Sequence, residues 1–307
     1  MYPHDTAIER AARRSGQGLI WGVMAIGVYI TYKVLDIADL TVDGSICTGA
    51  AVCTMLLLGG QSPWLALLCA VLAGVLAGAV TGLLHVGLGI PPILAGILTQ
   101  MVLWSVNLKL LGKANQALPA RTTPVLLSQM DVGGALPVLL GFCVVLVALL
   151  VLFFGTELGC ALRATGCNPV MSRAQGVNTG LMKVVGLALS NGVVALSGAL
   201  LCQYQGYTDV NMGRGAVVIG LAAVVIGQAV LGRRGGRMAV QLGGVILGAV
   251  IYYIVYQVII FAGFDTDLLK MFSAVVVAVF LGVPHVKAQL KAHSRSKKGD
   301  SGHAENE

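Results

Sequence analysis

The feature that most limits the fold of this chain is a series of apolar stretches long enough to cross a lipid bilayer. A helix needs roughly 20 mostly apolar residues to cross about 30 Å of hydrocarbon. Such stretches lie at 18–38, 64–87, 92–111, 135–154, 183–204, 238–261 and 267–284, and two shorter ones lie at 44–60 and 215–231. Hydrophobic residues make up 57% of the 307 and charged residues only 11%, unlike a soluble domain. The sequence therefore predicts an all-α membrane protein, a polytopic bundle of about eight or nine transmembrane or re-entrant segments.

Basic residues indicate the expected orientation of these segments. Short cytoplasmic loops are enriched in Lys and Arg, and this chain gathers them at its N-terminus, in the 155–182 loop, in the run 232–237 and in its C-terminal tail. We therefore expect a cytoplasmic N-terminus (1–17), a transmembrane domain (18–285) and a cytoplasmic, basic, disordered tail (286–307). No cleavage site follows the first apolar stretch, so we expect it to be retained as an anchor.

The first half of the chain poses a problem for this orientation, because five apolar stretches precede residue 155. An odd number of crossings cannot leave the N-terminus and the 155–182 loop on one side. The 44–60 stretch is short and lies between "DLTVDGS" and "GGQSP", so we expect it to be broken or re-entrant and surrounded by protein or a water-filled cavity. The 215–231 stretch is likewise followed by a Gly-rich turn and a longer helix, and we interpret the pair as an internal repeat.

Glycines recur every four residues in two of the apolar stretches. Gly74, Gly78 and Gly82 form one row, and Gly244 and Gly248 form another. Such rows allow helix backbones to approach closely in a bilayer. They predict close helix packing, either inside one subunit or along a dimer seam.

Motifs that carry catalysis or hold cofactors are missing from the sequence. It has no GxxxxGK[ST] phosphate loop, no HExxH and no GxSxG, and its seven cysteines form no CxxC pair. We therefore expect no catalytic residue, no metal site and no cofactor in this chain. The formal charge of +7 lies at the edges of the apolar stretches, which favours membrane lipid over nucleic acid as the partner. An integral-membrane enzyme or a structural subunit remains an alternative class without supporting residues.

The most polar interval within the apolar part of the chain is residues 157–180. Thr156 is placed to cap a short helix, with Glu157 in its first turn and Gly166 at its end. The interval therefore predicts a short, capped helix at the cytoplasmic surface.

A second short helix is predicted directly after the first. Asn168 is placed as its N-cap, Pro169 at its first position and Gly176 as a left-handed stop. It would present four side chains to a soluble partner: Met171, Ser172, Arg173 and Gln175. The alternative is a capped connector that binds nothing.

Several runs of this sequence resemble one family. The run from Thr156 to Gly236, with "ELGCALRATGCNPVMSRAQG" and "GAVVIGLAAVVIGQAVLGRRGG", is similar to permease subunits of ABC importers of the branched-chain amino acid and ribose type. Asp39–Ser45 and Leu88–Thr99 also match, so the resemblance covers about residues 35–285. Cys167 stands where the family often has an acidic residue, and "AVVIGQAVLGRRGG" replaces a shorter glycine run.

The resemblance implies that the 157–180 interval holds a coupling helix that docks in a groove of a cytoplasmic ABC ATPase. The residues implied in this coupling are Arg163, Asn168, Pro169, Met171, Ser172, Arg173, Gln175 and Gly176. ATP would bind to the partner subunit alone. Further implied partners are an extracytoplasmic solute-binding protein and a second permease, either another copy of this chain in a homodimer or a related subunit in a heterodimer. The expected location is a bacterial inner membrane, and the basic residues predict both termini on its cytoplasmic side.

The nature of the solute is indicated by a finer resemblance. The run from Ala188 to Gly215 looks closest to a subgroup associated with amino-acid binding proteins, notably for aromatic amino acids such as tryptophan and tyrosine. A branched-chain amino acid or, in a sugar-type permease, a sugar is the alternative. A self-sufficient ion-coupled transporter is disfavoured, because ionisable residues are scarce inside the apolar stretches and such carriers need an ion site there.

Polar residues of the second half are candidates for the solute path and for binding-protein docking. The path candidates are Asn191, Gln203, Gln228, Tyr252, Tyr256 and Gln257. The docking candidates are Tyr204, Tyr207, Asp209 and Arg214. Buried amides in a bundle also bond helix to helix, and a polar loop is also simply solvated, so each group has a structural alternative.

Overall fold

A computed structural model describes residues 7–119, 125–129, 132–231 and 237–261, with isolated positions at 271, 275 and 278. The helices are α1 (Ala7–Tyr29), which continues into the π-helical turn η1 (Ile30–Val34), α2 (Val42–Leu58), α3 (Pro63–Gly87), α4 (Pro92–Leu111), α5 (Val132–Gly155), α6 (Glu157–Cys167), α7 (Pro169–Ala174), α8 (Thr179–Gln205), α9 (Ala216–Leu231) and α10 (Met238–Phe261). Short strands β1 (Asn115–Ala117) and β2 (Tyr207–Asp209) pair antiparallel. The tail (286–307) and most of the predicted 267–284 segment lie outside the described residues.

Helices dominate the described part of the chain, as the apolar pattern predicts. Five of the described helices, α3, α4, α5, α8 and α10, are long and apolar enough to cross a membrane, and α2 and α9 are shorter apolar helices. The two-stranded sheet was not predicted. It ties the connection after α4 to the connection after α8.

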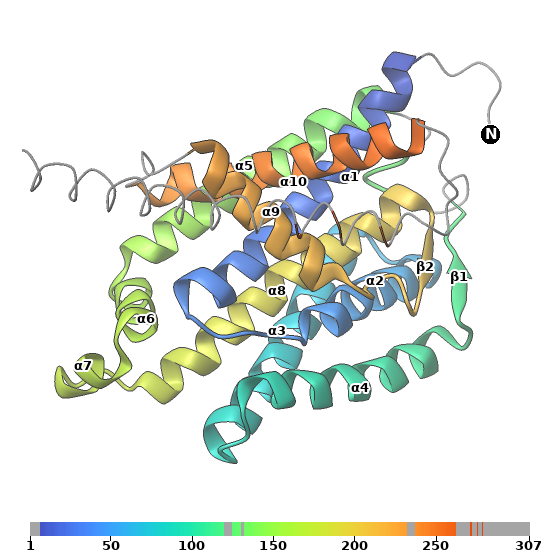
Figure 1. The fold of residues 1–307 in the computed structure, drawn as a ribbon. Coiled ribbons are helices and arrows are strands. Elements are labelled where there is room, and N and C mark those ends of the chain that lie inside the picture. Colours follow the sequence, from blue (N-terminus) through green and yellow to red (C-terminus); the bar gives the residue numbers. More distant parts are fainter. Residues whose placement is uncertain are drawn as a thin grey trace, which may run out of the picture.

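The central helix α8 defines the two ends of the bundle (Figure 1). We call the end that carries α6 and α7 the loop end, and the end that carries β1 and β2 the sheet end. α1 runs antiparallel to α8: the Ser190 hydroxyl donates to the Gly27 carbonyl at 2.8 Å, and Gly16 lies against the Tyr204 ring near the sheet end. α1 therefore begins at the sheet end, opposite α6 and α7.

This arrangement corrects the predicted position of the N-terminal region. The basic residues predict that residues 1–17 share a side with the 155–182 loop, whereas the start of α1 lies at the other end of the bundle (Figure 1). The physical reason is the odd number of apolar stretches before residue 155. Successive helices from α1 to α5 alternate in direction along the bundle, so the start of α1 and the end of α5 lie at opposite ends. The predicted interruption is also displaced: α2 is continuous, and the break precedes it at residues 35–41.

Two sets of three helices repeat one arrangement in opposite directions. In each set a long helix (α1 or α8) is followed by a short helix (α2 or α9) and a long antiparallel one (α3 or α10). α3 packs along α8 as α10 packs along α1, and α2 packs on α8 as α9 packs on α1. The two short helices start side by side, where Asp43 bonds to Gly215 and Val217. From there α2 runs to the sheet end, where Thr54 bonds to Thr208 of β2, and α9 runs to the loop end, where Leu231 contacts Gly244 near the start of α10. The internal repeat is confirmed, and its topology is inverted.

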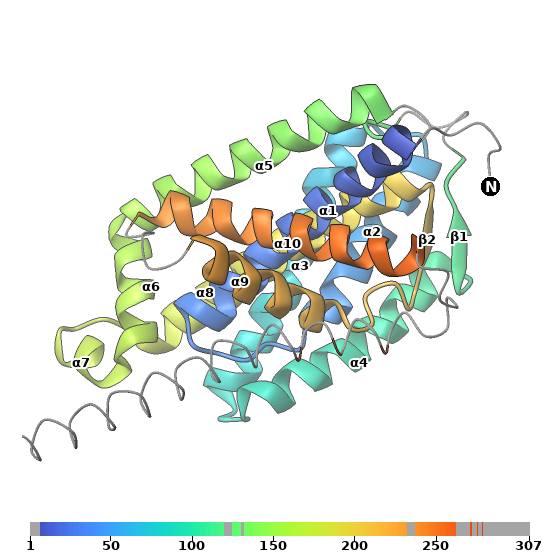
Figure 2. The ribbon, with the colours of Figure 1, turned by 45° about the horizontal axis from the view of Figure 1, so that its top comes forward.

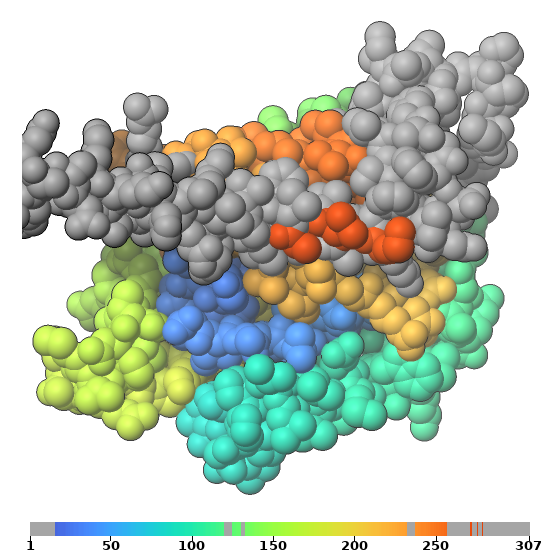
Figure 3. Space-filling view, in the orientation of Figure 1, coloured from blue at the N-terminus to red at the C-terminus, as the bar shows by residue number. Residues whose placement is uncertain are grey.

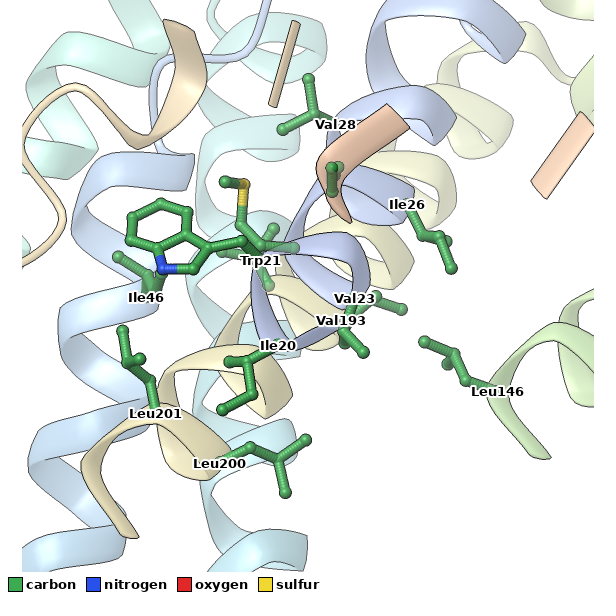
Figure 4. Packing of buried hydrophobic residues seen from close by; sticks show 14 of the residues in the cluster. Ile20, Trp21, Val23, Ile26, Val28, Ile46, Leu146, Val193, Leu200 and Leu201 are labelled. Carbon is green, nitrogen blue, oxygen red and sulfur yellow. The ribbon is translucent and has the colours of Figure 1, made fainter. Parts of the chain in front are cut away.

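Side chains of α1 and α8 form the centre of the apolar core. Figure 4 shows Ile20, Val23 and Ile26 of α1 among residues from α2, α5 and α8. The peripheral helices α4 and α5 lie on opposite sides of this core (Figure 2). Apolar side chains exposed on α3, α4 and α5 therefore face the surroundings of the subunit, as in a membrane-embedded bundle.

Both predicted glycine rows pack inside the subunit. Gly74, Gly78 and Gly82 of α3 lie so close to α8 that an added Cβ would overlap α8 atoms in each case. Gly244 and Gly248 meet α9 in the same way. Between the two alternatives of the sequence, the structure supports packing within one subunit.

Gly49 offers a direct test of this close packing. A Cβ at Gly49 of α2 would overlap the backbone carbonyl of Ala195 in α8, and backbone cannot move aside as a flexible side chain does. We expect Gly49→Val to destabilise the protein by about 3 kcal/mol, the cost of severe overpacking. Thermal unfolding in detergent measures it. Gly141→Val in α5 is the matched control, because nothing lies within 4 Å of its added Cβ; equal melting temperatures for the two variants would contradict the packing argument.

Candidate transport site

The loop between α5 and α8 is built from two capped helices, as predicted. The Thr156 hydroxyl caps α6 by accepting from the backbone N–H of Gly159 at 3.3 Å. The Asn168 side chain caps α7 by accepting from the N–H groups of Val170 and Met171 at 3.1 and 3.0 Å. Pro169 is the first residue of α7, and Gly176 adopts the predicted left-handed conformation with φ of 83°.

The tip of α7 exposes apolar side chains at the loop end. Val170 is 77% exposed and Met171 61% exposed. The space-filling view shows α6 and α7 as a projection from one end of the molecule (Figure 3). This apolar pair is therefore accessible at the surface of the projection.

Other residues of the predicted coupling set differ in their surroundings. Ser172 is buried and its hydroxyl donates to the Asn168 carbonyl at 2.9 Å, so its predicted presentation to a partner is wrong. Arg173 donates to the Thr179 hydroxyl at 2.8 Å and fixes α7 to the start of α8. Arg163 donates to the Phe154 carbonyl at 3.0 Å. The remaining members, Asn168, Pro169, Met171, Gln175 and Gly176, are exposed.

The helix α6 touches the break between η1 and α2. Gly166 lies against the Val34 carbonyl and Leu35, and an added Cβ there would overlap the Val34 oxygen. The predicted role of Gly166 as the end of α6 is wrong, because α6 continues to Cys167 and Gly166 provides close contact instead. α6 and residues 34–35 are therefore in direct contact at this point.

Beyond this contact, the break is held by a buried polar network around Asp39. Its carboxylate accepts from the Asn191 amide at 2.7 Å and from the backbone N–H of Thr41 at 2.8 Å. Asn191 in turn accepts from the Ser45 hydroxyl at 2.6 Å and donates to the Leu187 carbonyl at 2.9 Å. The network satisfies the backbone N–H of Thr41 in the break and bonds the break to the middle of α8.

A chain of hydroxyl groups extends this network across three helices. Thr41, before α2, bonds to Thr81 of α3 at 2.9 Å, and Thr81 donates to Thr99 of α4 at 2.9 Å. The break is thus connected to α3 and α4 as well as to α8.

The second short helix begins beside the first. The Asp43 carboxylate, in the first turn of α2, accepts from the N–H groups of Gly215 and Val217 at 2.9 and 3.0 Å. These donors lie at the start of α9, so Asp43 caps α9 across the bundle and its charge meets the positive end of the helix dipole. The N-terminal ends of the two half-helices therefore meet in mid-bundle.

A cavity of about 590 Å³ lies beside this meeting point, between α2, α4 and the 209–214 turn. Its polar lining comes from Asp43, Gln100, Ser105, Asn107 and Arg214, and its apolar lining includes Ile97, Met101, Trp104 and Val210. Asn107 is 1% exposed, and neither amide atom has a hydrogen-bond partner among the described residues. Such a group is costly unless a ligand or water bonds to it.

None of the five predicted path residues whose side chains the structure describes lines this cavity. Asn191 and Gln203 are buried and bonded within the bundle, the latter accepting from the backbone N–H of Leu126 at 3.0 Å. Tyr252 is buried in the core, Tyr256 packs on Tyr253 with ring centroids 6.1 Å apart, and Gln228 is exposed on α9. The Gln257 side chain lies outside the described residues. Asn191 and Gln203 therefore match the alternative interpretation, in which buried amides form hydrogen bonds between parts of the bundle and do not line a solute path.

The four predicted docking residues also differ in their exposure and contacts. Tyr204 is buried, so it is not available at the surface and its prediction is wrong. Tyr207 is exposed in β2, and Asp209 caps the following turn by accepting from the N–H of Asn211 at 2.6 Å. Arg214 is exposed and lines the cavity.

Several residues of the site were not singled out from the sequence, among them Asp39, Asp43, Trp104 and Asn107. The two aspartates lie in "DLTVDGS", which bounds the 44–60 stretch and forms part of the family resemblance, but neither residue was predicted to have a role of its own. Asn107 was detectable as an uncharged polar residue inside the 92–111 stretch. Among the described residues, no three His, Cys, Asp or Glu side chains are grouped to hold a metal, and all seven cysteines are free.

The inverted repeat, the half-helices and the capped loop define a membrane transport subunit, and comparisons with known proteins give its family. The family described as "Branched-chain amino acid transport system / permease component" matches residues 12–284. The chain belongs to this family of ABC importer permeases.

Individual relatives cover most of the chain. A tyrosine transport system permease protein of Clostridioides difficile is 38% identical over 278 residues, 90% of this chain and 91% of the relative. An uncharacterised protein of Rickettsia prowazekii is 33% identical over 276 residues, 89% of this chain and 96% of the relative. An autoinducer 2 import system permease protein of Escherichia coli is 29% identical over 240 residues, which are 75% of this chain and 66% of the relative. No solved structure matches this chain.

Proposed function

We propose that this chain forms the membrane path of an ABC importer whose solute is an amino acid, most specifically an aromatic one. The observation that carries the transport mechanism is the contact of Gly166 in α6 with Val34 at the break. It connects an exposed loop to the mid-bundle cavity through residues 34–43. The solute class is supported by the relative that carries tyrosine in its name and by Trp104 in the cavity wall.

The partners follow from the two ends of the bundle. A separate cytoplasmic ATPase binds ATP and receives α7, so the loop end faces the cytoplasm. An extracytoplasmic solute-binding protein docks at the sheet end, where Tyr207 is exposed. A second copy of this chain completes the path from the α4 side, and lipid of a bacterial inner membrane covers the remaining apolar faces.

Purification of the tagged protein from its native membrane tests this function. We expect a stoichiometric ATPase to copurify, and reconstituted vesicles to take up labelled L-tyrosine only with internal ATP and the binding protein. Uptake by the chain alone, driven by an ion gradient, would instead establish a secondary transporter.

A further inference from the structure

We infer that the cavity between α2, α4 and the 209–214 turn, here called the α2–α4 cavity, binds the solute through both charged groups of an amino acid. This inference rests on the proposed function and adds to it a binding site within the permease itself. The volume of about 590 Å³ lies inside the range of roughly 300–1,000 Å³ usual for small-molecule sites.

Charge in the cavity wall is present in both signs. Arg214 has no hydrogen bond or ion pair from its guanidinium within the described parts of the chain, which leaves its donors for a ligand carboxylate. Asp43 keeps its carboxylate at the wall while its two oxygens cap α9. A carboxylate oxygen accepts more than one hydrogen bond, so an ammonium group can bind there. The wall therefore suits a zwitterion better than an anion or a cation.

Asn107 adds a polar group that no other described residue bonds to. Its amide is buried, lacks a partner in the described structure and lines the cavity. It can donate to a carboxylate or accept from an ammonium group. Binding a zwitterion removes the penalty of this unsatisfied amide.

The apolar side of the cavity fits the side chain of the solute. Ile97, Met101 and Trp104 follow one another along α4, and Trp104 is 43% exposed. An indole ring beside a Met side chain favours an aromatic ligand by stacking and sulfur contacts.

A second cavity nearby differs from the α2–α4 cavity in having a mostly apolar lining. It has about 550 Å³ between α3 and α4, and its lining contains Thr48, Thr99 and Asn107 but otherwise only apolar residues such as Leu76 and Leu98. That cavity suits an acyl chain, whereas the α2–α4 cavity places two opposite charges at its wall.

Equilibrium binding of labelled L-tyrosine to the full-length permease in nanodiscs tests this inference. We expect saturable binding that L-tryptophan displaces and D-ribose does not. Tyramine, which lacks the carboxylate, and 3-(4-hydroxyphenyl)propionate, which lacks the ammonium group, should each compete at least about tenfold less well than tyrosine.

Two variants test which side chains of the cavity contact the bound amino acid. Arg214→Gln should weaken tyrosine binding about tenfold and leave tyramine nearly unaffected, because tyramine has no carboxylate to lose. Asn107→Leu should also weaken binding about tenfold while leaving the melting temperature unchanged or higher, since it removes an unsatisfied buried amide. Arg237→Gln, an exposed arginine at the other end of the bundle, is the matched control and should bind like the wild type.

The outcomes separate this inference from the proposed function. Absence of tyrosine binding to the permease, or equal affinities for Arg214→Gln and Arg237→Gln, overturns the site; ATP-driven uptake by the complete transporter would then still support the function. A lower melting temperature for Asn107→Leu with unchanged binding also overturns the site, because Asn107 would be structural. Uptake that needs no ATPase overturns the function, whatever the permease binds.

Discussion

Met171→Glu in α7 should abolish ATP-driven uptake while the permease remains folded in the membrane. Val170 and Met171 are largely exposed, so their burial in a groove of the ATPase would contribute about 1.5–3 kcal/mol each. A carboxylate in the same groove costs more, because it would be buried without a partner. Loss of about 3 kcal/mol corresponds to a roughly hundredfold weaker complex. Copurification of the ATPase and uptake of labelled solute measure the effect.

Two controls distinguish docking from a general effect of charge. Met171→Leu keeps the apolar surface and should retain uptake. Leu88→Glu places the same carboxylate at another exposed apolar position, 71% exposed in the turn between α3 and α4, and should retain most of it. If Met171→Glu copurifies with the ATPase as the wild type does, α7 is not the docking element.

Much of the fold could be predicted because the signals that determine it are local. Apolar length predicted the helices, and the spacing of Gly74, Gly78 and Gly82 predicted a close helix contact that the structure places on α8. Asn168, Pro169 and Gly176 act where cap chemistry predicts, since a cap depends on neighbours within a few residues.

Features set by distant partners could not be predicted in this way. The direction of α1 follows from its packing against α8, whereas counting basic residues weighs only the ends of segments. The pairing of β1 with β2 joins two three-residue strands that have no local pattern. Asp43 looks like an ordinary N-terminal acid of α2, and its role as the cap of α9 becomes visible only in three dimensions.

The same reasoning applies to two of the predicted path residues, Asn191 and Gln203, which bond to other parts of the bundle. Asn191 and Gln203 are polar and deep, but each has its bonds satisfied by the bundle. Asn107 is equally deep and has none within the described residues. In a bilayer, an unsatisfied buried amide is more informative about a ligand than a buried amide as such.

Gly166→Val should uncouple ATP hydrolysis from transport without releasing the ATPase. The substitution leaves the α7 tip intact but forces α6 away from the Val34 carbonyl, which an added Cβ would overlap. The break at 35–41 connects onward through Asp39 to Asn191 of α8 and through Thr41 to α3. We expect the ATPase to copurify and hydrolyse ATP, and uptake to fall more than about tenfold, because a 1 Å displacement of a coupled element is enough for such losses.

Gly155→Val, in the same loop, is the matched control, because nothing lies within 4 Å of its added Cβ. It should hydrolyse ATP and take up solute like the wild type. Gly166→Ala meets the Val34 carbonyl with a single methyl group, so it provides a milder variant if the valine prevents insertion. Uptake and hydrolysis that fall together in Gly166→Ala would show that α6 positions α7 for docking rather than transmitting movement to the break. Docking of the ATPase uses the tip of α7, whereas transmission of movement to the break uses the contact of Gly166 with Val34. Only a variant that keeps ATP hydrolysis and loses uptake would therefore show that this contact transmits the movement.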